Sequence, residues 1–230
     1  MPDHAPFTRQ QVSDAVSPLG WRLVLGALFT EVDVPALVQA AMVAAIASTT
    51  VGADGQDRLT ADIRAERAVL RLMPPLGGLV SAYEVELARQ VSESLASRGY
   101  VTSPGRRHRA GVLQSLEIAI DAMDIGKVRP FWQAVTGYVG EEGPSDLTSG
   151  LIDPMGRGPA IWFQQMDEPR LQRNRIHIDV DVPHDEGEAR VRAAIAAGGT
   201  LLSDERAPAF WVLADPEGNE ACVCTWQARD

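Results

Sequence analysis

The second half of the chain repeats one pattern of elements at an interval of about 60 residues. An alternating apolar and polar stretch at 116–121 precedes a helical pattern at 128–135 and strands that end near Trp162 and Phe163. A similar stretch at 176–181 precedes a helical pattern at about 186–197 and strands that end at 222–226. Asp-Pro turns at 152–156 and 214–218 mark corresponding hairpins. The repeat predicts two βαβββ units that share one domain.

A break in composition at 101–111 separates this repeat from the first part of the chain. The stretch holds Pro104, two glycines and four basic side chains counting His108, and it lacks apolar periodicity. Such a stretch is typical of a linker between domains. We therefore predict an α+β protein with a domain at 1–103, a linker at 104–111 and a second domain at 112–230.

The first domain shows a mixed pattern of helices and strands. The pattern predicts a helix at 7–16 with Thr8 as cap, strands at 20–25 and 27–32, a helix capped by Asp33, a strand at 65–73, and a helix opened by the capping box Ser81–Glu84 and ending at Gly99. The helix after Asp33 has apolar residues at helical spacing, namely Leu37, Val38, Ala41, Met42, Ala45 and Ile46. The predicted order is α-β-β-α-β-α.

Composition and charge exclude several classes of partner. The 230 residues carry a formal net charge of -10, which disfavours non-specific binding to nucleic acid. The apolar run at 34–51 contains Gln39 and three hydroxyl residues, so it is too polar to span a membrane. The two cysteines lie too close on one strand to bridge easily, and the N-terminus lacks a signal-peptide pattern. We expect a soluble cytoplasmic protein with a small-molecule ligand and no nucleic-acid or membrane partner.

Side-chain alternation assigns a polar face to each half of the repeat. In the first strand, Glu117 and Asp121 point away from the isoleucines, and in its counterpart Arg175, His177, Asp179 and Asp181 do the same. The apolar sets are expected to face the helices, so the polar sets line the opposite face. Glu117 and His177 occupy equivalent positions. A carboxylate and an imidazole there indicate either a general acid/base pair or metal ligands.

Residues 112–228 resemble the vicinal oxygen chelate superfamily in its glyoxalase-like branch. The resemblance rests on Phe131-Trp132 with Gly137-Tyr138, on 174–179, and on 211–223. It implies that the paired modules form an open cup with a divalent metal on the concave face. It also implies Glu117 and His177 as first-strand ligands, with Gln164 or Gln165 offered by the last strand of the first module and Cys222 where a glutamate ligand usually lies. Glu220 lies two residues before Cys222 with the same strand parity, so it can reach the same cup and complete the set. The donors suit Zn²⁺, Fe²⁺, Ni²⁺ or Mn²⁺.

The leading functional hypothesis is a lyase or isomerase acting on a small organic molecule in this cup. Glu117, His177 and Glu220 are the candidate catalytic residues, because a cation or an imidazolium stabilises an enolate-like intermediate. The candidate substrate-binding residues are Asp121, Arg175, Asp179, Trp211, Cys222 and Trp226. The alternative is a non-catalytic protein that sequesters drug-like molecules. On that reading His177 is hydrogen-bonded to Asp179 or Glu117, and Cys222 is a buried apolar filler.

Residues 7–100 resemble pterin-4a-carbinolamine dehydratase. The resemblance rests on Gly20-Trp21, the order of elements, and Gly77-Gly78-Leu79 before an acidic helix. Where that family has His-His-Pro, this chain has Gln56-Asp57-Arg58, and the only histidine of the first 103 residues is His4. We expect that 4a-hydroxytetrahydrobiopterin dehydratase activity is lost and that this domain is structural or dimerising. Both families commonly form dimers, so a homodimer is expected.

Overall fold

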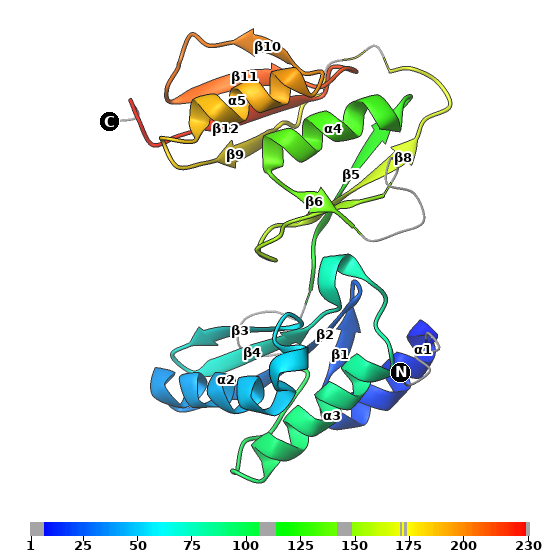
Figure 1. Cartoon of the computed structure of the whole chain (residues 1–230), viewed down its shortest axis with the longest axis vertical. Helices are drawn as coiled ribbons and strands as arrows, with labels where there is room; N and C mark the ends of the chain where they lie inside the picture. The colour runs from blue at the N-terminus through cyan, green and yellow to red at the C-terminus, as the bar shows by residue number, and fades with distance from the viewer. Residues whose placement is uncertain (1–6, 106–113, 142–148, 171, 173, 229–230) are drawn as a thin grey trace. The chain divides into compact units, whose positions relative to one another are not determined.

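The computed structural model describes residues 7–105, 114–141, 149–170, 172 and 174–228. It divides into two compact units, Met1–Ser115 and Leu116–Asp230, each of which is described by itself (Figure 1). The boundary falls just after the predicted linker, most of which lies outside the described residues together with its cluster of basic side chains.

The N-terminal unit is an antiparallel sheet with helices packed against one face. Its elements are α1 (Arg9–Val16), β1 (Arg22–Val24), β2 (Ala27–Asp33), α2 (Leu37–Val51), β3 (Leu59–Arg64), β4 (Arg67–Leu72) and α3 (Ala82–Ala96), joined by short 3-10 turns. The strand order is β1-β2-β4-β3. Inward-facing leucines of β2 and β4 pack with Trp21 and with α2 and α3 into one buried core.

The observed order is α-β-β-α-β-β-α, so the predicted order lacked one strand. The missing strand, β3, pairs with β4 along its whole length from Leu59↔Leu72 to Arg64↔Arg67. All of its residues after Leu59 are exposed, which removes the apolar alternation that identifies a half-buried strand. The predicted helix at 7–16, the two strands joined at Gly26, and the capping box at Ser81 and Glu84 are observed.

Helix α2 differs from its prediction in both its cap and its buried side. It begins after Ala36, whereas Asp33 is the exposed last residue of β2. Its buried residues are Ala40, Val43, Ala47 and Val51, while Leu37, Val38 and Met42 are 52%, 63% and 50% exposed. The helix has no charged residue, so hydrophobicity alone does not distinguish its two sides. The sheet packs against the side with alanines and valines.

Glu84 is the most buried acidic residue of this unit and holds the start of α3. It is 1% exposed, and its Oε2 accepts hydrogen bonds from the Ser81 backbone N–H and hydroxyl, each at 2.7 Å. Its other oxygen forms an ion pair with Arg58, whose guanidinium lies 5.0 Å from the centre of the Tyr83 ring. Arg58 therefore has a structural contact at the start of α3.

The C-terminal unit contains two βαβββ modules. The first consists of β5 (Glu117–Ala122), α4 (Ile125–Thr136), β6 (Val139–Gly140), β7 (Leu151–Ile152) and β8 (Ala160–Gln165). The second consists of β9 (Ile178–Asp181), α5 (Gly187–Ala196), β10 (Thr200–Ser203), β11 (Phe210–Ala214) and β12 (Glu220–Cys224). The sheet orders β5-β8-β7-β6 and β9-β12-β11-β10 are equivalent, and in each sheet the first and last strands are parallel.

Strand register confirms the duplication residue by residue. Ile118 is aligned with Ile161 in the first module, and Ile178 is aligned with Ala221 in the second, so the same pairing recurs about 60 residues later. Continuing this register by one residue places Glu117 level with Ala160, and His177 level with Glu220. The equivalence of Glu117 and His177 expected from the sequence is thus present in the backbone.

The two modules share one core between their helices. Helices α4 and α5 lie side by side, with Phe131, Trp132 and Val191 in the same buried cluster as Leu213 and Val223 (Figure 1). The modules are also joined by hydrogen bonds from Arg190 Nη1 to the Val135 carbonyl at 3.2 Å and from the backbone N–H groups of Met123 and Asp124 to Glu217. These contacts make the C-terminal unit one body.

In the parts of the chain that the structure describes, no helix combines the length and the apolar character needed to cross a membrane.

Candidate functional site

The polar and apolar faces of the first strands follow the predicted alternation. On β5, Ile120 and Ala122 are buried, while Glu117 and Asp121 are exposed. On β9, the exposed residues are Asp179 and Asp181. The apolar residues belong to or pack against the core beside α4 and α5, so the acidic side chains face the opposite side of each sheet.

His177, Asp179 and Cys222 form the one group of potential metal ligands found among the described residues. Their donor atoms all lie within 4.8 Å of one another. His177 Nδ1 is 2.9 Å from Asp179 Oδ1 and 3.7 Å from Cys222 Sγ. The register explains the grouping, because Asp179 is aligned with Cys222 across the parallel β9–β12 pair and His177 lies two residues earlier. We call these three residues the HDC group.

The HDC group has a buried end and an exposed end. Cys222 is buried, whereas His177 and Asp179 are about half exposed. Burial, followed by the nearby charge of Asp179, raises the pKa of the Cys222 thiol to about 12. The thiol is therefore protonated at neutral pH, and a bound cation would be required to convert it to a thiolate.

The donor set of the HDC group fits a divalent transition metal. One sulfur, one imidazole nitrogen and one carboxylate oxygen are ligand types that Zn²⁺ accepts in protein sites. Three protein ligands leave a position open for water or substrate, which is the arrangement of catalytic zinc sites. Hard cations such as Mg²⁺ and Ca²⁺ prefer oxygen ligands, so sulfur at this position disfavours them.

Two of the three expected metal ligands lie outside the HDC group. Glu117 is exposed at the start of β5. The pKa of Glu141 is raised, mainly because Glu141 is partly buried and secondly because of the negative charge of Glu117. Glu220 lies at the start of β12 and lines a pocket described below. Of the set Glu117, His177 and Glu220, the structure groups only His177 with other potential ligands. Its neighbours come from its own sheet because the β9–β12 register brings Asp179 and Cys222 beside it.

The two tryptophans expected beside the cup lie in different surroundings. Trp211 is 8% exposed and belongs to the core, where its ring faces Gly187 of α5. This position corrects the expectation that Trp211 binds substrate, since the ring is on the helix side of its strand. Trp226 is 65% exposed and makes an edge contact with His184, with ring centroids 5.4 Å apart.

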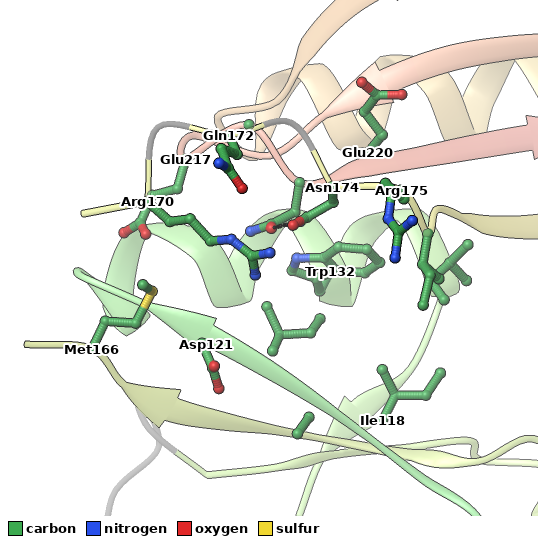
Figure 2. Close-up of a pocket in the computed structure, with 16 residues that line it drawn as sticks. Ile118, Asp121, Trp132, Met166, Arg170, Gln172, Asn174, Arg175, Glu217 and Glu220 are labelled. Carbon is green, nitrogen blue, oxygen red and sulfur yellow. Dashed lines mark hydrogen bonds between the residues drawn. The ribbon is translucent and has the colours of Figure 1, made fainter. Parts of the chain in front are cut away.

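A pocket of about 920 Å³ lies between the modules (Figure 2). It is bordered by β5, by the segment that joins the modules, by the start of β9 and by the hairpin before β12. Its apolar lining residues are Ile118, Ile120, Trp132, Ile176 and Ile178, and its charged ones are Asp121, Arg170, Arg175, Glu217 and Glu220. Trp132 and the segment around Arg170 were not assigned to a site from the sequence, because no local pattern marks a pocket formed by distant segments.

Asp215 fixes one wall of this pocket. It is 3% exposed, and its Oδ2 accepts hydrogen bonds from Trp132 Nε1 at 2.9 Å and from Asn219 Nδ2 at 2.8 Å. Its Oδ1 accepts from the backbone N–H groups of Glu217 and Asn219, each at 2.9 Å. Asn174 in turn donates to Asn219. The indole, the hairpin and the connecting segment are therefore linked by one hydrogen-bond network.

Comparison with known proteins identifies the class of the C-terminal unit. Two βαβββ modules with equivalent strand order define a paired-module α+β domain. Residues 117–224 match the model of the family described as the glyoxalase-like domain. This match, which covers just under half of the chain, supports the glyoxalase-like resemblance seen in the sequence.

Solved structures resemble about half of the chain. A hypothetical protein from S. aureus is 16% identical, with coverage of 50% of this chain and 95% of that chain and a TM-score of 0.41. A glyoxalase/bleomycin resistance protein/dioxygenase family enzyme from Burkholderia phytofirmans is 23% identical, with coverage of 47% and 95% and a TM-score of 0.38. The fosfomycin resistance protein FosX from Listeria monocytogenes is 14% identical, with coverage of 51% and 94% and a TM-score of 0.40. No curated protein sequence matches the chain.

Proposed function

We propose that the C-terminal unit is a metal-dependent glyoxalase-like enzyme that acts on a small organic molecule. The observation that carries the proposal is the HDC group, whose three different donor atoms lie within 4.8 Å of one another on the face away from the helices. The glyoxalase-like family match over 117–224 supports the same assignment. A reaction of the lyase or isomerase type fits a site that combines a Lewis acid with titratable side chains.

In this proposal each residue of the HDC group has a separate task. When bound, the divalent metal supplies charge stabilisation for an oxyanion that develops on the substrate. Cys222 anchors the buried end of the site. Asp179 supplies the carboxylate ligand, and its Oδ1 lies 2.9 Å from Nδ1 of His177, which supplies the imidazole ligand. The half-exposed side chains of His177 and Asp179 border the open position that a substrate can reach.

Glu117 and Glu220 have supporting tasks in the same proposal. Glu117 occupies, in the first module, the position that His177 occupies in the second, and its carboxylate is exposed. Such a group can accept a proton from a substrate held near the sheets. Glu220 is level with His177 in the extended β9–β12 register and adds negative charge beside the site.

The N-terminal unit is proposed to have a structural role, with the protein acting as a homodimer. Helix α2 supports this role, since Leu37, Val38 and Met42 form an exposed apolar surface. Arg58 and Glu84 support it as well, because their ion pair places a structural contact in the segment where the dehydratase family has histidines.

Metal analysis of the purified protein tests the proposed function. We expect close to one Zn²⁺, Fe²⁺, Ni²⁺ or Mn²⁺ per chain and only trace metal in a His177→Ala variant, because one of three protein ligands is lost. The matched control is His184→Ala, which removes an exposed histidine that contacts Trp226 and leaves the HDC group intact. A metal-free protein that binds a drug-like molecule and releases it unchanged would instead be a binding protein.

A further inference from the structure

We propose that the pocket between the modules binds an amphipathic organic anion, namely an aromatic or aliphatic body carrying one acidic group. The residues that line the pocket do not include His177, Asp179 or Cys222. Ile178 lines it, and by strand alternation Ile178 and Asp179 point to opposite faces of β9. Arg175 and Glu220, which also line the pocket, lie two residues from His177 and from Cys222, so the pocket adjoins the HDC group. None of the contacts argued below involves a bound metal.

The apolar part of the pocket has contributions from both modules. Ile118 and Ile120 of β5 and Trp132 of α4 come from the first module, and Ile178 comes from β9 of the second. The Trp132 ring is held by its Nε1 hydrogen bond to Asp215, so its orientation is set before any ligand arrives. A flat apolar body suits these walls, because stacking on an indole adds to the burial of apolar surface.

The pocket also has the size expected for such a ligand. Ligand sites of roughly 300–1,000 Å³ bury most of the surface of a drug-sized molecule. The volume of about 920 Å³ lies within this range. Strands β5 and β9, which both contribute lining residues, are edge strands of their sheets.

Two guanidinium groups give the pocket its preference for an anion. Figure 2 shows Arg170 and Arg175 on either side of Trp132, with both side chains directed toward the pocket. Neither arginine forms an ion pair with any carboxylate within the described ranges. Guanidinium groups bind carboxylates and phosphates through paired hydrogen bonds, so two of them facing one apolar space favour a negatively charged group.

The three carboxylates near the pocket are directed elsewhere. Both oxygens of Glu217 accept hydrogen bonds from backbone N–H groups, of Met123 and Asp124. Asp121 is exposed on β5, and Figure 2 shows the carboxylates of Asp121 and Glu220 pointing away from Trp132. The charge presented to a ligand is therefore mainly that of Arg170 and Arg175.

Calorimetric titration with matched probes tests this site. The probes are 2-naphthoate, which carries a carboxylate, and 2-naphthamide, which has the same ring system and no charge. We expect the naphthoate to bind about tenfold more tightly than the amide, because charge-assisted hydrogen bonds to guanidinium form only with the acid. Arg170→Gln and Arg175→Gln should each weaken naphthoate binding by about tenfold and leave amide binding unchanged.

Two further variants separate the charge from the apolar walls. Ile176→Ser should weaken both probes alike, because it removes apolar contact without changing charge, and this exposed residue is not needed for folding. Arg192→Gln is the control, since this arginine pairs with Glu188 on the surface of α5 and should change neither affinity. Equal affinity of the two probes, no binding of naphthoate, or unchanged binding in both arginine variants would overturn the proposal.

Discussion

Replacing Asp215 by alanine is expected to destabilise the C-terminal unit by about 4 kcal/mol, because several buried donors lose a charged acceptor at once. Asp215 is 3% exposed and accepts from Trp132 Nε1, from Asn219 Nδ2 and from two backbone N–H groups. Water has little access to replace it. Urea unfolding followed by tryptophan fluorescence measures the change in the free energy of unfolding.

The duplicated module offers a matched control for this prediction. Asp153 occupies the corresponding hairpin and accepts from the backbone N–H groups of Met155, Arg157 and Gly158. These three donors are exposed, so water can replace the lost carboxylate, and Asp153→Ala should cost only about 1 kcal/mol. Equal losses in the two variants would contradict the claim that burial of the Asp215 network makes the difference.

Replacing Glu84 by glutamine is expected to destabilise the N-terminal unit by about 3 kcal/mol, because removing one partner of a buried ion pair leaves the other uncompensated. Glu84 is 1% exposed, whereas Arg58 keeps partial contact with solvent, which limits the loss. Thermal unfolding followed by circular dichroism measures the effect. Glu93→Gln on the same helix is the control, since its pair with Arg89 is exposed and should contribute less than about 0.5 kcal/mol. A loss in Glu84→Gln as small as that of the control would be inconsistent with a structural role for Arg58.

Much of the C-terminal fold follows from local sequence patterns. The repeat at 116–121 and 176–181 predicts duplicated modules because equal patterns form equal elements, and the register of Ile118 and Ile178 confirms it. Alternation along β5 and β9 also predicts which side chains share a face, since the period of a strand is fixed. In the N-terminal unit the same approach fails for β3, where exposure leaves no apolar alternation.

The pattern of a single strand is not enough to predict which residues form the HDC group. The sequence singled out His177, and it placed Asp179 and Cys222 among candidate substrate-binding residues. Their grouping depends on the parallel β9–β12 register, which fixes Asp179 beside Cys222 and is set by the whole module. Glu117 is equivalent to His177 in the repeat, but equivalence in a duplicated fold does not by itself bring two side chains to one ligand.

The pocket between the modules was harder to predict from the sequence than the HDC group. Trp132 has the helical spacing of a core residue and is buried, yet its ring also lines the pocket. Arg170 lies in the connecting segment, where no periodicity distinguishes a ligand-binding side chain from a solvated one. Trp211 shows the opposite case, because a strand tryptophan next to a candidate site is in fact packed against Gly187.

Titration of the metal-free protein with Co²⁺ tests the central claim most directly, namely that Cys222 and His177 hold a divalent metal. A thiolate bound to Co²⁺ gives an intense near-ultraviolet band, and a site with few ligands gives visible bands stronger than those of the aqueous ion. We predict saturation near one Co²⁺ per chain, with a thiolate band that is absent in Cys222→Ser and retained in His184→Ala. Failure to bind Co²⁺ stoichiometrically, or a spectrum that Cys222→Ser leaves unchanged, would contradict the metal site.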